Sequence, residues 1–153
     1  MRTQETIRTL NRLIQTCRDS EEFCRTLSDA AETQGLTDSL RHRSEEWGRQ
    51  GDELQALVLL LDGEPETGGT PSAWLSRARL IAKSALLGPS DMPTLEQWQH
   101  MQQRAVDRYE EALSSYLPER IRRTVSLQAD RIDDRRGQIV SLRGQYALHT
   151  HGA

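Results

Sequence analysis

Apolar residues recur along this chain at intervals of three and four positions, and this spacing restricts the fold more than any other feature. A 3-4 spacing places apolar side chains on one face of an α-helix, whereas a half-buried strand needs strict alternation. The helical spacing runs from Ile7 to Tyr146, and no segment alternates convincingly. The sequence therefore predicts an all-α protein.

The apolar pattern divides into four long helical stretches. Their faces run from Ile7 to Ala31, from Leu36 to Leu61, from Leu95 to Tyr116 and from Ile121 to Tyr146. Residues 62–71 are rich in Gly and Pro, and Pro118 stands between the last two stretches, so both places break the helical pattern. We expect four long helices.

Capping residues predict where the helices begin and end. Gly35 is expected to end the first helix, because glycine readily adopts the left-handed conformation that follows a helix. Thr37 or Asp38 would then cap the second helix. Thr94, with Gln97 three positions later, is similar to a capping box for the third long helix.

The connections between these helices predict the topology. Tight loops join the first helix to the second and the third to the fourth, so each pair is antiparallel. About 30 residues separate the second from the third, and they contain a short helix from Trp74 to Ala85. One long crossover at this place is typical of ferritin-like bundles. We predict a single ferritin-like antiparallel four-helix bundle over residues 1–148, with a flexible tail at 149–153.

Composition and charge exclude several classes of protein. The longest apolar run, Ala56 to Leu61, has six residues, whereas a membrane span needs about 20. A net charge of −3 argues against broadly electrostatic nucleic-acid binding. The first 18 residues are polar and unlike a secretory signal, which favours a cytoplasmic location. Cys17 and Cys24 would lie about 10 Å apart on a helix, too far for a disulfide, so we expect two reduced core thiols.

Polar residues interrupt the apolar stripe near the middle of every long helix. Buried polar groups are costly unless they are paired, so such a layer needs either a metal site or a hydrogen-bond and ion-pair network. The polar layer consists of Glu21, Gln50, Gln102, Gln128, Arg135 and Arg136.

The residues of this layer favour a network over a metal. A ferritin-like di-metal site takes a Glu from each of two helices and Glu-x-x-His from each of the other two. The chain has no Glu-x-x-His. We expect Glu21 to be buried and to pair with Arg135 or Arg136, assisted by Gln128 and Gln102.

Several short stretches along the chain form a distinctive series. They are Leu13-Ile14, Asp19 to Phe23, Glu53 to Val58, Gly63 to Pro65, Ala82 to Leu86, Tyr109 to Leu113 and Leu117-Pro118. In these stretches the chain resembles a bacterial family of ferritin-like four-helix-bundle proteins of unknown function. The resemblance implies a ferritin-like fold along nearly the whole chain, and it implies no particular role.

The chain also departs from this family at the expected metal ligands. Family members tend to carry acidic residues where this chain has Gln99 and Gln102, and often a histidine where it has Arg136. Asp133, three residues before Arg136, would then be a relic of Glu-x-x-His. Arginine does not ligate cations, and glutamine lacks the charge that offsets a divalent ion. The metal alternative retains Glu21, Glu53 and Asp133 as ligands for iron or manganese, although Glu53 on its own is predicted to be a solvated residue.

Two further features are open to a functional reading. Gly48 and Gly51 leave space on one side of the second helix, and we expect Trp74 or Trp98 to fill it. The crossover helix carries Arg77, Arg79 and Lys83 with no acidic residue nearby, which is compatible with an anionic membrane surface or an acidic partner.

The sequence favours a non-catalytic ferritin-like bundle in which a polar network replaces a di-metal centre, without a cofactor and without nucleic acid as a partner. A homodimer is the expected assembly. The alternatives are a di-iron or di-manganese protein and a membrane-surface or stress-related interaction module that uses the basic crossover helix. No motif indicates an enzymatic reaction or a particular protein partner.

Overall fold

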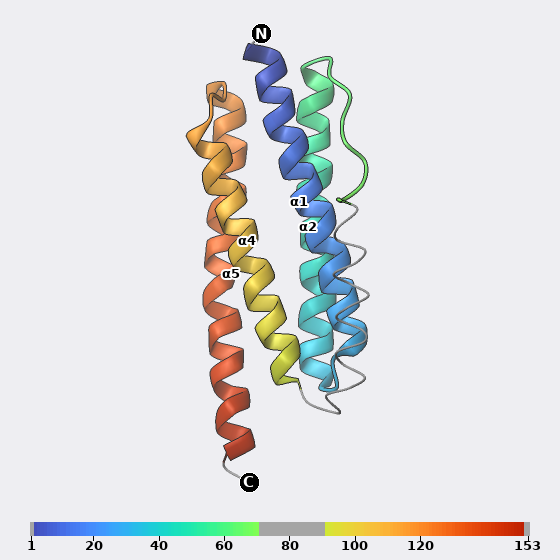
Figure 1. Ribbon diagram of the computed structural model, residues 1–153, viewed down its shortest axis with the longest axis vertical. Coiled ribbons are helices and arrows are strands. Elements are labelled where there is room, and N and C mark those ends of the chain that lie inside the picture. Colours follow the sequence, from blue (N-terminus) through green and yellow to red (C-terminus); the bar gives the residue numbers. More distant parts are fainter. Residues whose placement is uncertain (1, 71–90, 152–153) are drawn as a thin grey trace.

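The computed structural model describes residues 2–70 and 91–151, which form four helices and contain no strand. These helices are α1 (Arg2–Ala30), α2 (Gln34–Leu60), α4 (Met92–Ser114) and α5 (Glu119–His151) (Figure 1). The all-α prediction is thus confirmed for the described residues. Among the helices that they form, none is long and apolar enough to cross a membrane. The predicted short helix from Trp74 to Ala85 lies outside them. α5 reaches His151, into the predicted tail.

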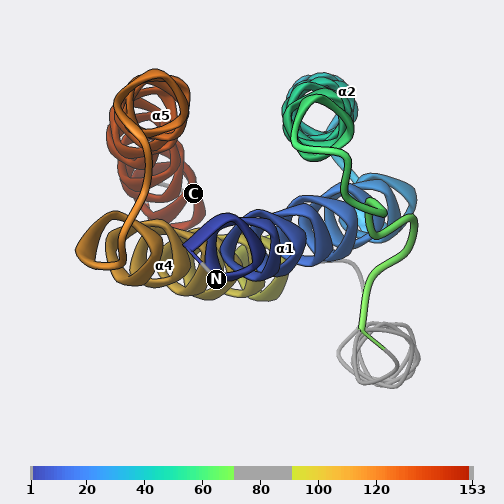
Figure 2. The same ribbon diagram turned by 90° about the horizontal axis from the view of Figure 1, so that it is seen from above.

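The helices are arranged as two antiparallel pairs. α1 packs against α2, α4 packs against α5, and α1 and α4 join the two pairs. α2 ends and α4 begins at opposite ends of the molecule (Figure 1). Seen from above, α2 and α5 stand on the same side of α1 and α4 (Figure 2). This arrangement is consistent with a four-helix bundle in which α2 and α5 approach each other less closely than the paired helices do.

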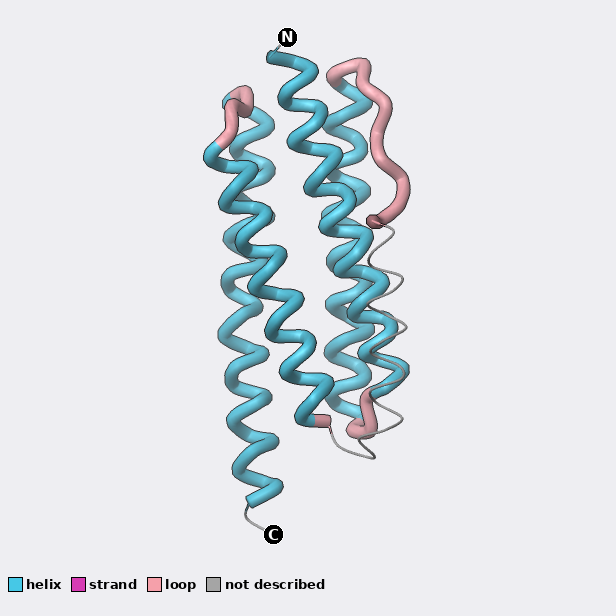
Figure 3. Tube along the Cα trace, viewed as in Figure 1, coloured by secondary structure: helices cyan, strands magenta, loops and turns pink. Residues whose placement is uncertain are grey.

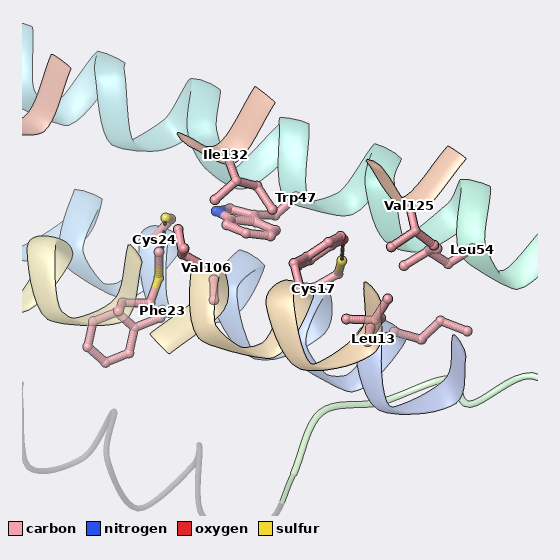
Figure 4. Packing of buried hydrophobic residues seen from close by; sticks show 14 of the residues in the cluster. Leu13, Cys17, Phe23, Cys24, Trp47, Leu54, Val106, Val125 and Ile132 are labelled. Atoms are coloured by element: carbon pink, nitrogen blue, oxygen red, sulfur yellow. Dashed lines mark hydrogen bonds between the residues drawn. The ribbon is translucent and has the colours of Figure 1, made fainter. Parts of the chain in front are cut away.

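The predicted apolar faces form the core. Trp47 of α2 lies toward Ile132 of α5, and Leu54 of α2 toward Val125 of α5 (Figure 4). Full burial of each large aliphatic side chain contributes about 1.5–3 kcal/mol. Of the residues used to predict these faces, Tyr116 is an exception, with 41% of its surface exposed. The largest fully buried apolar side chains are those of Leu10, Leu13, Ile14, Leu27, Leu40, Leu54, Val58, Leu95, Trp98, Tyr109 and Ile139.

The boundary between α1 and α2 differs from the prediction. α2 begins at Gln34, so Gly35 lies in its first turn and does not end α1, and Thr37 and Asp38 lie inside α2. The N-cap residue, Thr33, makes no side-chain capping bond. Instead the carboxylate of Asp91 accepts hydrogen bonds from the backbone N–H groups of Glu32 (2.7 Å) and Thr33 (2.9 Å). The turn between α1 and α2 is therefore held by a residue almost 60 positions away.

The ends of α4 are set by other residues than the predicted capping box. α4 begins at Met92 with Asp91 as its N-cap, earlier than Thr94 would indicate, and Pro93 occupies its first turn. Proline suits this position because the first N–H groups of a helix have no intrahelical partner. At the other end, the Arg122 guanidinium donates to the carbonyl oxygens of Leu113 (2.7 Å) and Ser115 (2.8 Å).

The loop that follows α2 is fastened to α1 (Figure 3). Asp62 has a left-handed φ of 58°, and the N–H of Gly63 bonds back to the carbonyl of Val58, which ends α2 as the sequence predicts. Farther along, Asn11 exchanges hydrogen bonds with the backbone of Glu64 and Glu66. The Asp19 carboxylate then accepts from the backbone and hydroxyl of Thr70.

Replacement of Asp91 by Ala should lower the free energy of unfolding by about 2–3 kcal/mol, because two backbone N–H groups lose a charged acceptor that is itself 1% exposed. Urea unfolding followed by circular dichroism measures this loss. The control is Asp107→Ala on the exposed face of α4, which should change stability by less than about 0.5 kcal/mol. Equal effects of the two substitutions would contradict this account.

Candidate functional site

A buried polar layer lies at the middle of the bundle, and its members are glutamines. Gln128 is fully buried, Gln102 is 2% exposed and Gln50 is 9% exposed. Each interrupts an apolar stripe of its own helix, as the sequence indicates. Buried carboxamides need hydrogen-bond partners, so their contacts determine what the layer does.

Gln128 of α5 is the centre of this layer. Its Oε1 accepts a hydrogen bond from the hydroxyl of Tyr109 on α4 (2.7 Å). Its Nε2 donates to the backbone carbonyl of Gln50 (3.2 Å) and to Oε1 of Glu53 (2.9 Å), both on α2. One carboxamide therefore joins three helices and uses both of its polar atoms.

The network continues to α1 through Tyr109. The Tyr109 hydroxyl lies 3.3 Å from Sγ of Cys17. Because the phenol proton goes to Gln128, the Cys17 thiol is the donor in this contact. Burial raises the pKa of Cys17 to about 12 and raises the pKa of Tyr109 well above its usual value. Both groups therefore keep their protons at neutral pH, and the chain of hydrogen bonds from α1 to α2 stays complete.

Gln102 belongs to the same layer but makes a separate contact. Its Nε2 donates to the backbone carbonyl of Ile132 at 2.6 Å, which fixes α4 against α5 one turn away from Gln128. Cys17, Tyr109 and Glu53 were not predicted as members of the network. Cys17 and Tyr109 occupy ordinary apolar positions in the stripes, and only their polar atoms reveal a second role.

Glu21 does not pair with Arg135 or Arg136, and this expectation is wrong. Its side chain is 23% exposed, and its carboxylate lies 3.4 Å from Arg18 and 3.7 Å from Arg25 on its own helix. The reason is geometric. α2 lacks a side chain at Gly48, where an added Cβ would come within 2.6 Å of Glu21 Oε2, so Glu21 lies against α2 and not toward α5.

The glycine face of α2 is filled by an ion pair and not by tryptophan. Arg18 lies against Gly51, where an added Cβ would be 3.0 Å from its guanidinium carbon. The guanidinium donates to the carbonyl of Gly48 (3.3 Å) and to the carboxylate of Asp52 (2.8 Å). Desolvation of Arg18 opposes its charge, but the neighbouring carboxylates of Asp52 and Glu21 outweigh that cost, so the pKa of Arg18 is raised overall. Trp98 packs in the core, and Trp74 lies outside the described residues.

Arg135 and Arg136 are on the surface and have other partners. Arg135 bonds to Glu46 at 3.2 Å, and Arg136 bonds to Asp133 (2.6 Å) and to Gln103 (2.9 Å). Glu46 was not predicted from the sequence, although it stands three positions after Arg43, a spacing that brings two side chains together on a helix. Asp133 and Arg136 thus form a surface ion pair.

The fold does not bring together the three carboxylates that the metal alternative requires. Glu21 faces α2, Glu53 contacts Gln128, and Asp133 pairs with Arg136 at the surface. Within the parts of the chain that the structure describes, no three His, Cys, Asp or Glu side chains gather as a metal site would require. The basic residues Arg77, Arg79 and Lys83 lie outside those parts.

Two hollows adjoin the helices. A broad groove of about 630 Å³ follows α1 and α4 on the side of Asp19 and Thr70. A smaller cleft of about 290 Å³ lies between α2 and α5, against the polar layer. The residues that line this cleft are Arg43, Glu46, Trp47, Arg49, Gln50, Glu53, Gln102, Arg131, Ile132 and Arg135.

Comparison with known protein families gives a match over residues 5–115, which covers most of α1, all of α2 and α4 and the connection between them. The matching family is the domain of unknown function DUF2383. The chain belongs to this family. No curated protein matches it. α5 lies beyond the part matched to DUF2383, so Gln128 and the cleft arginines Arg131 and Arg135 are outside the matched range.

Tyr109→Phe should lower stability by about 1–2 kcal/mol, because it removes the hydroxyl that Gln128 accepts from and that Cys17 contacts. In a double-mutant cycle with Gln128→Leu, the two substitutions should show a coupling energy of about 1 kcal/mol. The matched control is the exposed pair Gln103 and Asp107, which are also hydrogen-bonded and should couple by less than about 0.5 kcal/mol. Additive losses at Tyr109 and Gln128 would contradict the network.

Cys17 and Cys24 should resist thiol reagents in the native protein, because both are buried and free and both have a pKa of about 12. Ellman's reagent should detect almost no thiol at mildly alkaline pH and two thiols after unfolding in guanidinium. Since the thiol pKa values are raised on folding, their contribution to stability is complete below pH 9.0 and is lost as the pH rises towards about 12. Rapid reaction of the native protein would contradict this burial.

Proposed function

We propose that this protein is a non-catalytic ferritin-like bundle in which a hydrogen-bond network takes the place of a di-metal centre. The observation that carries the proposal is the position of Gln128. It is fully buried, and its carboxamide is shared between Tyr109 of α4 and two oxygens of α2. Such a residue is suited to holding helices in register.

The residues at this level do not fit a pair of divalent metal ions. Such ions need several carboxylates to offset their charge, whereas Gln50, Gln102 and Gln128 are neutral. The nearby carboxylate of Glu53 already accepts a hydrogen bond from Gln128. The adjoining cleft is lined by four arginines, which repel cations. We therefore assign no chemical step to a metal at this place.

The network has a structural consequence that an apolar layer would lack. If α5 slid by one turn along α2 and α4, the Gln128 carboxamide would lose its partners, and a buried polar group without partners costs about 1–3 kcal/mol. The hydroxyl of Tyr109 would lose its acceptor as well. The layer therefore penalises wrong registers, which is the best-attested use of buried polar groups in helical bundles.

The proposal is tested by metal analysis of untagged protein expressed with added iron and manganese. We expect much less than one metal ion per chain and the same melting temperature with and without a chelator. Glu53→Ala, compared with Glu110→Ala on the exposed face of α4, should leave the metal content unchanged. Stoichiometric iron or manganese that is lost in Glu53→Ala but retained in Glu110→Ala would overturn the proposal.

A homodimer and a cytoplasmic location belong to the same proposal and stay predictions. Light scattering of the purified chain checks the assembly state. The network itself lies within one chain, because the contacts from Cys17 to Tyr109, from Tyr109 to Gln128 and from Gln128 to Glu53 are all made within a single copy. The proposed role of the layer therefore holds for a monomer or a dimer.

A further inference from the structure

The cleft between α2 and α5 has a chemical character that the register-holding network does not explain. α2 and α5 stand apart (Figure 2), and long polar side chains span the distance between them. Arg135 of α5 reaches Glu46 of α2, and Arg43 of α2 reaches Gln138 of α5. The cleft of about 290 Å³ lies among these side chains.

The charge around the cleft is predominantly positive. Its lining contains the four arginines 43, 49, 131 and 135 against two glutamates. The carboxylate of Glu46 is already engaged by Arg43 at 2.8 Å and by Arg135 at 3.2 Å. The carboxylate of Glu53 accepts a hydrogen bond from Nε2 of Gln128. The negative groups are therefore occupied within the protein, while the positive charge is in excess.

Two buried donors in the cleft lining have no hydrogen-bond partner among the residues that the structure describes. They are Nε of Arg43 and Nε2 of Gln50. Arg43 is 6% exposed and Gln50 is 9% exposed, so bulk water does not freely solvate either side chain. Buried donors are nearly always paired in folded proteins, and these two share the wall of one hollow. Each of these two N–H donors therefore lacks a hydrogen-bond acceptor.

We propose that this cleft binds a small molecule bearing an oxyanion, either a phosphate group or a carboxylate. The buried donors of Arg43 and Gln50 contact the oxyanion, and the exposed Arg49 and Arg131 at the rim contribute charge. Trp47 and Ile132 supply an apolar wall for the rest of the molecule. Arginine and carboxamide donors bind anionic oxygens and cannot ligate a cation.

This inference is independent of the proposed function. The Gln128 network uses the side chains of Gln128, Tyr109, Cys17 and Glu53, whereas the oxyanion uses the side chains of Arg43 and Gln50. Loss of anion binding would leave the network intact, and a metal found in the bundle would not by itself remove the donors of the cleft.

The test is calorimetric titration of the full chain with inorganic phosphate and, separately, with malonate, at fixed ionic strength set with chloride. We expect saturable binding of at least one of them with one site per chain. Binding of phosphate alone identifies a phosphate-bearing ligand, binding of malonate alone identifies a carboxylate, and either result supports the proposal. No saturable binding of either anion would overturn it.

Variants locate the site. Gln50→Leu removes one buried donor and should weaken binding roughly tenfold, and Arg131→Gln at the rim should weaken it about threefold. Arg123→Gln, an exposed arginine of α5 that does not line the cleft, is the matched control and should bind as the parent does. Arg43→Gln should abolish binding if the variant folds, which circular dichroism establishes. Parent-like binding by both Gln50→Leu and Arg131→Gln would place the anion elsewhere and overturn the assignment.

Discussion

The hydrogen bonds of the Gln128 carboxamide are the contacts on which the alignment of three helices depends. One side chain on α5 accepts from α4 and donates twice to α2, and α1 is added through the thiol of Cys17. Apolar packing is tolerant of small shifts, because one methyl group can replace another at similar cost. A buried carboxamide is not tolerant, since its donors and acceptors are fixed in direction. The apolar faces stabilise a bundle, and Gln128 selects one alignment of it.

The same layer accounts for the cleft beside it. At the level of Gln50, Gln102 and Gln128, long polar side chains lie between α2 and α5, in contrast to the closer approach of α1 and α2 along Gly48 and Gly51. Glycines let one helix approach another closely, and arginines and glutamines hold helices apart. The bundle is consequently tight on one side of α2 and hollow on the other, and arginines are concentrated on the hollow side.

Much of the fold followed from the sequence, because helical periodicity is a local property. The faces around Leu10, Leu54 and Ile132 were predicted from spacing alone, as were the buried glutamines, since each breaks a stripe. The partner of Glu21 could not be predicted in this way. It depends on which side of α1 meets α2, and the glycines that admit the Arg18–Glu21 pair are on another helix. The contacts of Tyr109 escaped prediction for a similar reason, because a buried tyrosine in a stripe is indistinguishable from a packing residue.

The turn between α1 and α2 was also beyond local prediction, and its attachment to Asp91 has a consequence for how the chain is made. The acceptor for the N–H groups of Glu32 and Thr33 is the carboxylate of Asp91, which the ribosome adds about 60 residues later. A nascent chain that ends before Asp91 can pair α1 with α2, but the two N–H groups in the turn between them then bond to water and not to this carboxylate. The turn between α1 and α2 thus gains its two hydrogen bonds to Asp91 only after the start of α4 has been synthesised. The final structure of this local turn therefore depends on a segment that is distant in the sequence.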